Sequence, residues 1–112
     1  MSRDMSRELI QQGDVLVVKI DVIPPDAAKV SSSGGWYVLV EGEHTGHTHK
    51  IEDSGKVEVF VTPEGRRFLK VLESLELYHD THLPRIILPG LYEIERIKEV
   101  DPFTEEIHTV TD

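Results

Sequence analysis

The sequence predicts an all-β fold, a small single-domain β-sandwich or barrel with short helical turns near its ends. Its apolar residues fall in short β-branched or alternating segments, and glycine or proline turn signals recur about every 8–12 residues. No segment sustains the period of about 3.6 residues that marks an amphipathic helix. A chain of 112 residues has room for one domain. We expect it to span residues 1–112, with 1–12 and 104–112 as candidate loose tails.

The N-terminal half is expected to begin with a helical turn and to continue in strands. Residues 6–12 would form the turn, which Gly13 would end as a C-cap. The β-branched run at 15–20 is long enough for a strand. The elements expected after it are an extended turn at Pro24-Pro25, a loop or hairpin tip at 31–35 and a strand at 36–40.

The C-terminal half alternates more regularly between apolar and polar residues. In the strand expected at 56–62, Val57, Val59 and Val61 share one face. The later elements are a turn at 63–65, strands at 66–72, 74–78, 85–88 and 91–97, and a last helical turn capped by Asp101-Pro102.

The chain is acidic, with 21 aspartates and glutamates against 12 lysines and arginines and a formal net charge of −9. A surface of this sign repels phosphate backbones, so we expect no nucleic-acid binding and consider a basic protein the fitting partner. Edge strands in so small a sheet also allow a homodimer.

The absence of cysteine excludes disulfides, thiolate metal sites and cysteine nucleophiles. No apolar run approaches the roughly 20 residues that span a bilayer, and the first residues lack the core of a signal peptide. We therefore expect a cytoplasmic protein without membrane contact, whose natural start is either Met1 or Met5.

Four of the six histidines form two close pairs. His47 and His49 are two residues apart, a spacing that places both rings on one face of a strand. His79 and His82 are three residues apart, which brings two rings to one side of a turn. We predict that the two pairs meet and bind a divalent transition metal, namely zinc, nickel or iron.

Carboxylates near these histidines suggest further roles. Glu43 or Asp80 would act as a general base if the metal site is open, which would make the chain a hydrolase or a cupin-like enzyme. His44 and Glu52 stand nearby as further ligands or as hydrogen-bond partners of the ligands. Whether the chain is an enzyme stays open at this point.

Two other interpretations of the histidines also stay open: a hydrogen-bonded structural cluster, or separate surface residues. His108, alone near the C-terminus, is expected to be inert. The rival function is a non-catalytic acidic binding module, phage-associated or accessory, that engages a basic partner. A closed metal site that only stabilises a thin core is the third alternative.

Several ordered motifs resemble those of a small uncharacterised all-β family from bacterial and phage genomes. They extend over nearly the whole chain and read Gln12-Gly13-Asp14-Val15-Leu16, Glu41-Gly42-Glu43, Thr45-Gly46-His47-x-His49, His79-x-x-His82-x-Pro84, Leu88-Pro89-Gly90-x-Tyr92 and Glu99-x-Asp101-Pro102. At Leu88-Pro89-Gly90 the chain departs from that family, which has one more residue before the glycine. The resemblance implies a coherent fold and carries no activity.

A fainter resemblance is to cupins, small β-barrels in which a His-x-His on a strand holds a metal with a glutamate and a later histidine. Gly42, His47, His49 and Glu52 imitate the first cupin motif, although the glycine and glutamate spacings are each one residue short. The second cupin motif is absent. The likeness implies a metal site by analogy alone.

Overall fold

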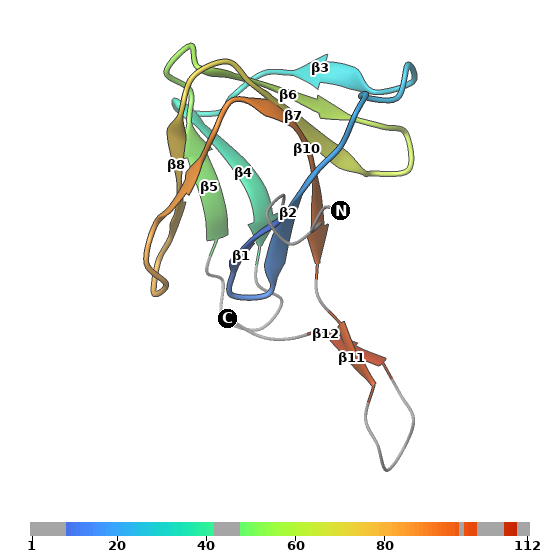
Figure 1. The fold of residues 1–112 in the computed structure, drawn as a ribbon, viewed down its shortest axis with the longest axis vertical. Helices are drawn as coiled ribbons and strands as arrows, with labels where there is room; N and C mark the ends of the chain where they lie inside the picture. Colours follow the sequence, from blue (N-terminus) through green and yellow to red (C-terminus); the bar gives the residue numbers. More distant parts are fainter. Residues whose placement is uncertain (1–8, 42–47, 97, 101–106, 110–112) are drawn as a thin grey trace, which may run out of the picture.

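The computed structural model describes residues 9–41, 48–96, 98–100 and 107–109, and within them the protein is all-β, as predicted. Its strands form two antiparallel sheets, consistent with a small β-sandwich, and a separate two-stranded hairpin (Figure 1). In chain order the strands are β1 (Leu9–Gln12), β2 (Val15–Lys19), β3 (Ala28–Val30), β4 (Trp36–Glu41), β5 (Thr48–Glu52), β6 (Val57–Val61), β7 (Arg67–Val71), β8 (Leu75–His79), β9 (Arg85–Ile87), β10 (Gly90–Arg96), β11 (Lys98–Val100) and β12 (Ile107–Thr109).

The two sheets differ in size and meet at one seam. The larger sheet has the strand order β1-β2-β10-β7-β6-β3, and the smaller has the order β4-β5-β8-β9. The edge strand β1 contacts the edge strand β9, so the sheets close on each other along this side. The β11–β12 hairpin extends away from both sheets (Figure 1).

The strands predicted from alternation are confirmed. Those expected at 15–20, 36–40, 56–62, 66–72, 74–78, 85–88 and 91–97 correspond to β2, β4, β6, β7, β8, β9 and β10, and their ends differ by one residue at most. The expected loop at 31–35 is a tight turn closed by a bridge between Ser33 and Trp36. The sequence patterns do not predict β1, β3, β11 or β12, and they indicate β5 only through the strand-like spacing of His47 and His49.

The prediction of a helical turn at 6–12 is wrong for residues 9–12, the part of this range that the structure describes. Residues 9–12 form β1, which pairs antiparallel with β2 from Leu9↔Val18 to Gln12↔Val15. Gly13 has a φ of 58°, the left-handed conformation that a helix C-cap and a tight hairpin turn both require. The signal at Gly13 was therefore real, but it marks the hairpin between two strands.

The expectations for the C-terminal end have mixed outcomes. Residues 107–109, placed in a candidate loose tail, form β12 and pair with β11 from Val100↔Ile107 to Lys98↔Thr109. The helical turn expected at Asp101-Pro102 lies outside the described residues. No helix occurs in the described ranges, and none of their residues belongs to a helix long and apolar enough to cross a membrane.

The core fills the space between the two sheets and follows strand alternation. On β6, the three valines predicted to share one face point inward, with Val57 and Val59 buried and Val61 half-buried. The other members of the core cluster come from both sheets: Val15, Val17, Tyr37, Leu39, Ile51, Leu69, Val71, Leu75, Leu77, Ile87, Tyr92 and Ile94. The sandwich is therefore closed by apolar side chains, most of them aliphatic, together with Tyr37 and Tyr92.

Replacing Leu77 by alanine tests this core directly. Leu77 has no exposed surface, so Leu77→Ala should lower the free energy of unfolding by about 3 kcal/mol through lost burial and the cavity left behind. Urea unfolding monitored by circular dichroism measures the change. Leu83→Ala is the matched control, because Leu83 is 83% exposed, and it should change stability by less than about 0.5 kcal/mol. Equal effects of the two substitutions would contradict this core.

Candidate functional site

Three of the four histidines predicted to bind metal lie together between the sheets. His49 on β5 and His79 at the end of β8 are directly opposite each other in the antiparallel register, and their ring centroids are 4.3 Å apart. The ring of His82, in the loop after β8, lies 4.7 Å from that of His79. His47 lies outside the described residues, as do His44 and Glu43. The described members of the two pairs therefore meet.

His49 is fully buried and is hydrogen-bonded at both ring nitrogens. Its Nδ1 lies 2.9 Å from Oε1 of Gln12, and its Nε2 lies 3.1 Å from Oδ1 of Asp14. The amide of Gln12 is oriented by its Nε2, which donates to the backbone carbonyls of Leu77 at 2.8 Å and Leu83 at 2.9 Å. Oε1 of Gln12 is thus an acceptor, and so is the carboxylate of Asp14. Both nitrogens of His49 must donate.

An imidazole ring that donates from both nitrogens carries two protons and a positive charge. A buried charge is costly unless it is paired, and the carboxylate of Asp14, which is 1% exposed, supplies the pair. The second oxygen of this carboxylate accepts a hydrogen bond from Nε of Arg96 at 3.0 Å. One buried carboxylate therefore bridges two cations.

The ring of His79, unlike that of His49, has an unprotonated nitrogen. Its Nδ1 lies 3.0 Å from the backbone nitrogen of Thr81 and 3.2 Å from that of His82. Both backbone groups are donors, so Nδ1 of His79 carries no proton and the ring is the neutral tautomer protonated at Nε2. A neutral ring beside the charged ring of His49 avoids repulsion between like charges.

This hydrogen bonding restricts what the rings can bind. A metal ligand needs a nitrogen lone pair directed at the ion. His49 has none in this arrangement, and the lone pair on Nδ1 of His79 faces two backbone donors. Across the described ranges, no group of three or more histidine, aspartate or glutamate side chains is arranged to hold a metal ion. The contacts of these two rings favour the structural interpretation.

His82 is the histidine with an unused atom. Its Nε2 is buried and has no hydrogen-bond partner among the residues that the structure describes. A groove of ≈ 410 Å³ runs beside it between the β1–β2 turn and the loop after β8. Arg85 borders this groove and donates from Nη1 to the backbone oxygen of Gln11, which ties the two segments together.

Of the candidate carboxylates, the two that the structure describes, Asp80 and Glu52, do not join the histidines. Asp80 follows β8 directly and is exposed to solvent. Glu52 lies three residues after His49 on β5, so alternation places it on the outer face while His49 points inward. Of the predicted general bases, Asp80 is thus a surface residue and Glu43 lies outside the described ranges.

Sequence reasoning missed the partners that decide the state of His49. Gln12, Asp14 and Arg96 are far from it along the chain, and the ion pair between Asp14 and Arg96 spans 82 positions. The one available signal was the Gln12-Gly13-Asp14 motif, which carried part of the family resemblance. It gave no indication that these side chains point at a histidine.

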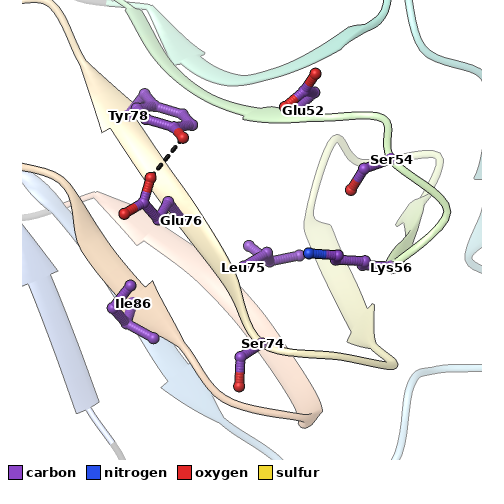
Figure 2. Close-up of a pocket in the computed structure, with 8 residues that line it drawn as sticks. All are labelled: Glu52, Ser54, Lys56, Ser74, Leu75, Glu76, Tyr78 and Ile86. Atoms are coloured by element: carbon purple, nitrogen blue, oxygen red, sulfur yellow. Dashed lines mark hydrogen bonds between the residues drawn. The ribbon is translucent and has the colours of Figure 1, made fainter.

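A second feature is a pocket of ≈ 260 Å³ on the outer side of the four-stranded sheet (Figure 2). It is lined by Glu52, Ser54, Lys56, Ser74, Leu75, Glu76, Tyr78 and Ile86. The hydroxyl of Tyr78 donates to Oε1 of Glu76 at 2.5 Å. This hydrogen bond, together with desolvation and the negative charges of Glu76 and Glu52, raises the pKa of Tyr78.

The fold and the buried network define a small all-β protein with an ionic cluster in its core. The chain belongs to a family described as a domain of unknown function (DUF8820), whose model matches residues 11–97. The matched range includes Gln12, Asp14, His49, His79, His82 and Arg96. No curated protein and no solved structure matches the chain. The family confirms the resemblance to an uncharacterised group and adds no activity.

The protonation of the two rings can be measured. At neutral pH, two-bond proton–nitrogen correlation spectra should show both ring nitrogens of His49 protonated and His79 as the Nε2-protonated tautomer, because of the partners of each nitrogen. Asp14→Asn, which removes the charge facing His49, should shift the His49 signals toward the neutral ring. A neutral His49 in the unsubstituted protein would contradict the network.

Proposed function

We propose that this protein is a non-catalytic binding module in which the histidines are structural and the acidic surface engages a basic protein partner. The observation that carries the proposal is the double hydrogen bonding of His49 to Gln12 and Asp14. A ring used in this way neither accepts a proton nor ligates an ion without breaking the network. The cluster therefore fits a role in holding the sheets together.

The position of the cluster also argues against catalysis by these residues. His49 has no exposed surface, and Asp14 and Gln12 are 1% and 3% exposed. A general base must come within hydrogen-bond reach of a substrate proton. Substrate cannot approach these groups while the seam between β1 and β9 is closed.

The surface charge indicates the kind of partner. Several carboxylates of the described ranges are exposed and have no ion pair there: Asp21, Asp26, Glu52, Asp53, Glu64, Glu73, Glu76, Asp80 and Glu95. Lys29 and Arg66 are paired with Glu58 and Glu93, while Lys19, Lys56, Arg67 and Lys70 have no ion pair within the described ranges. The chain as a whole carries a net charge of −9, and an excess of acid of this size attracts a basic protein and repels nucleic acid. A phage-associated or accessory role, a homodimer and a cytoplasmic location stay predictions.

Binding of a basic peptide tests the proposal. A fluorescein-labelled peptide in which arginine alternates with serine should bind the protein at about 0.02 M salt and should be released at about 0.5 M, because screening weakens exposed charge pairs. Fluorescence anisotropy measures the affinity. The same peptide with neutral citrulline in place of arginine is the control and should not bind.

The structural role of the histidines is tested with the same peptide. His82→Gln should bind it with unchanged affinity, because His82 belongs to the buried cluster. Failure of the unsubstituted protein to bind at low salt would contradict the proposed function, as would an affinity that depends on His82.

A transition-metal site is the second candidate function. It is favoured by the buried and unpartnered Nε2 of His82, since such a group in a folded protein calls for an explanation and an ion can supply one. His49 and His79 would have to exchange their present hydrogen-bond partners to join it. The predicted ligand set of His47, His49, His79 and His82, with zinc, nickel or iron, remains a proposal on these terms.

Metal analysis of protein purified without an affinity tag decides this candidate. If it is correct, the protein contains about one zinc, nickel or iron per chain, and His82→Ala loses most of it. Asp80→Ala is the control, because Asp80 neighbours the cluster in sequence and is exposed, and it should keep the metal. Protein without bound metal, or full metal content in His82→Ala, would contradict the assignment.

A further inference from the structure

The outer face of the four-stranded sheet combines aromatic, aliphatic and charged side chains. Its outward positions adjoin across the strands, as the pairs Trp36↔Glu52, Val38↔Lys50, Lys50↔Tyr78 and Glu76↔Ile86 show. Val38 is 47% exposed and Ile86 is 52% exposed. No described element packs over this face (Figure 1). It is therefore a sheet face without a partner.

Two carboxylates line the pocket on this face, that of Glu52 from β5 and that of Glu76 from β8. The β5–β8 register pairs residues as far as Lys50↔Tyr78, and Glu52 and Glu76 follow two residues further along the two strands on the same face. Like charges in such positions repel each other, and a cation between them removes the repulsion. The carboxylate of Glu52 has no hydrogen bond or ion pair within the described part of the chain. Glu76 is oriented by the hydroxyl of Tyr78, as Figure 2 shows.

The same face already contains one cation on an aromatic ring. Nζ of Lys50 lies 4.8 Å from the ring centroid of Trp36, and Tyr78 packs edge-on against Trp36 with centroids 5.7 Å apart. Cations bind to the faces of such rings by electrostatic attraction. Trp36 thus already carries the chain's own Lys50, and Tyr78, which lies beside Glu76 in the pocket, is the aromatic ring available to a further cation.

Lys56 modifies the charge of the pocket. In Figure 2 its side chain extends from the loop after β5 toward Leu75. It has no ion pair within the described part of the chain, so it neither neutralises Glu52 directly nor is fixed by it. A cation from a partner would meet repulsion from Lys56, and the pocket would bind that cation better without it.

We propose that this pocket binds an arginine side chain from a basic protein segment lying across the outer face of the four-stranded sheet. The planar guanidinium donates to Glu52 and Glu76 together and stacks against Tyr78, a combination that the ammonium of lysine does not reproduce. Val38 and Ile86 provide apolar contact for the neighbouring side chains of the segment. The inference rests on the proposed function and specifies its site and partner.

The experiment compares two double variants with the same change in net charge. Glu52→Gln/Glu76→Gln removes the pocket carboxylates, and the affinity for the fluorescein-labelled arginine–serine peptide should fall about tenfold. Glu64→Gln/Glu95→Gln removes two exposed carboxylates outside the pocket and should lower it less than about threefold. A matching lysine–serine peptide should bind the unsubstituted protein more weakly than the arginine peptide does.

A variant that binds the peptide more tightly is also needed, because misfolding can explain a loss of affinity but not a gain. Lys56→Met should tighten binding of the arginine peptide roughly threefold, and Lys70→Met, an exposed lysine outside the pocket, should change it less. Equal losses for the two glutamine double variants would overturn the pocket while leaving a general acidic binding surface. Absence of any peptide binding by the unsubstituted protein would instead overturn the proposed function, so the two failures are distinguishable.

Discussion

The arrangement of the two sheets depends on the hydrogen bonds that the carboxylate of Asp14 accepts. This carboxylate accepts hydrogen bonds from His49 on β5 and Arg96 on β10, while Gln12 connects the same histidine to the carbonyls of Leu77 and Leu83. These contacts join both sheets and the loop after β8 at one buried point. Removing one partner from such a buried ionic group typically costs about 3–5 kcal/mol, because a charge is left without compensation.

A polar cluster at this seam specifies the fold in a way that aliphatic packing alone does not. Apolar side chains pack with little directional preference, whereas the donors of His49 are directed at Oε1 of Gln12 and Oδ1 of Asp14 at hydrogen-bond distance. A slip of β5 against β8 by one residue would move His49 to the outer face and leave Asp14 and Gln12 without it. The network therefore sets the register of the smaller sheet relative to the β1–β2 hairpin.

The sequence was informative where local pattern decides and failed where distant partners decide. Alternation located β6 and β8 within one residue, and the spacing of the histidines indicated that His49, His79 and His82 would meet. The turn at Gly13 was assigned to a helix because a positive φ serves helix ends and hairpins alike. The protonation of His49 was beyond sequence reasoning, since it is set by acceptors 35 and 37 positions away.

Strand alternation separates the buried network of β5 and β8 from the proposed binding face on the same strands. The inward residues His49 and His79 belong to the buried network, and their neighbours Lys50 and Tyr78 lie on the outer face. A ligand on the outer face does not touch the histidines, yet the strands that carry its contacts are held in place by them. Changes at the network should therefore reach the outer face only through the stability of the smaller sheet. A rigid interior of this kind would lower the entropy lost when the proposed partner binds to the outer face.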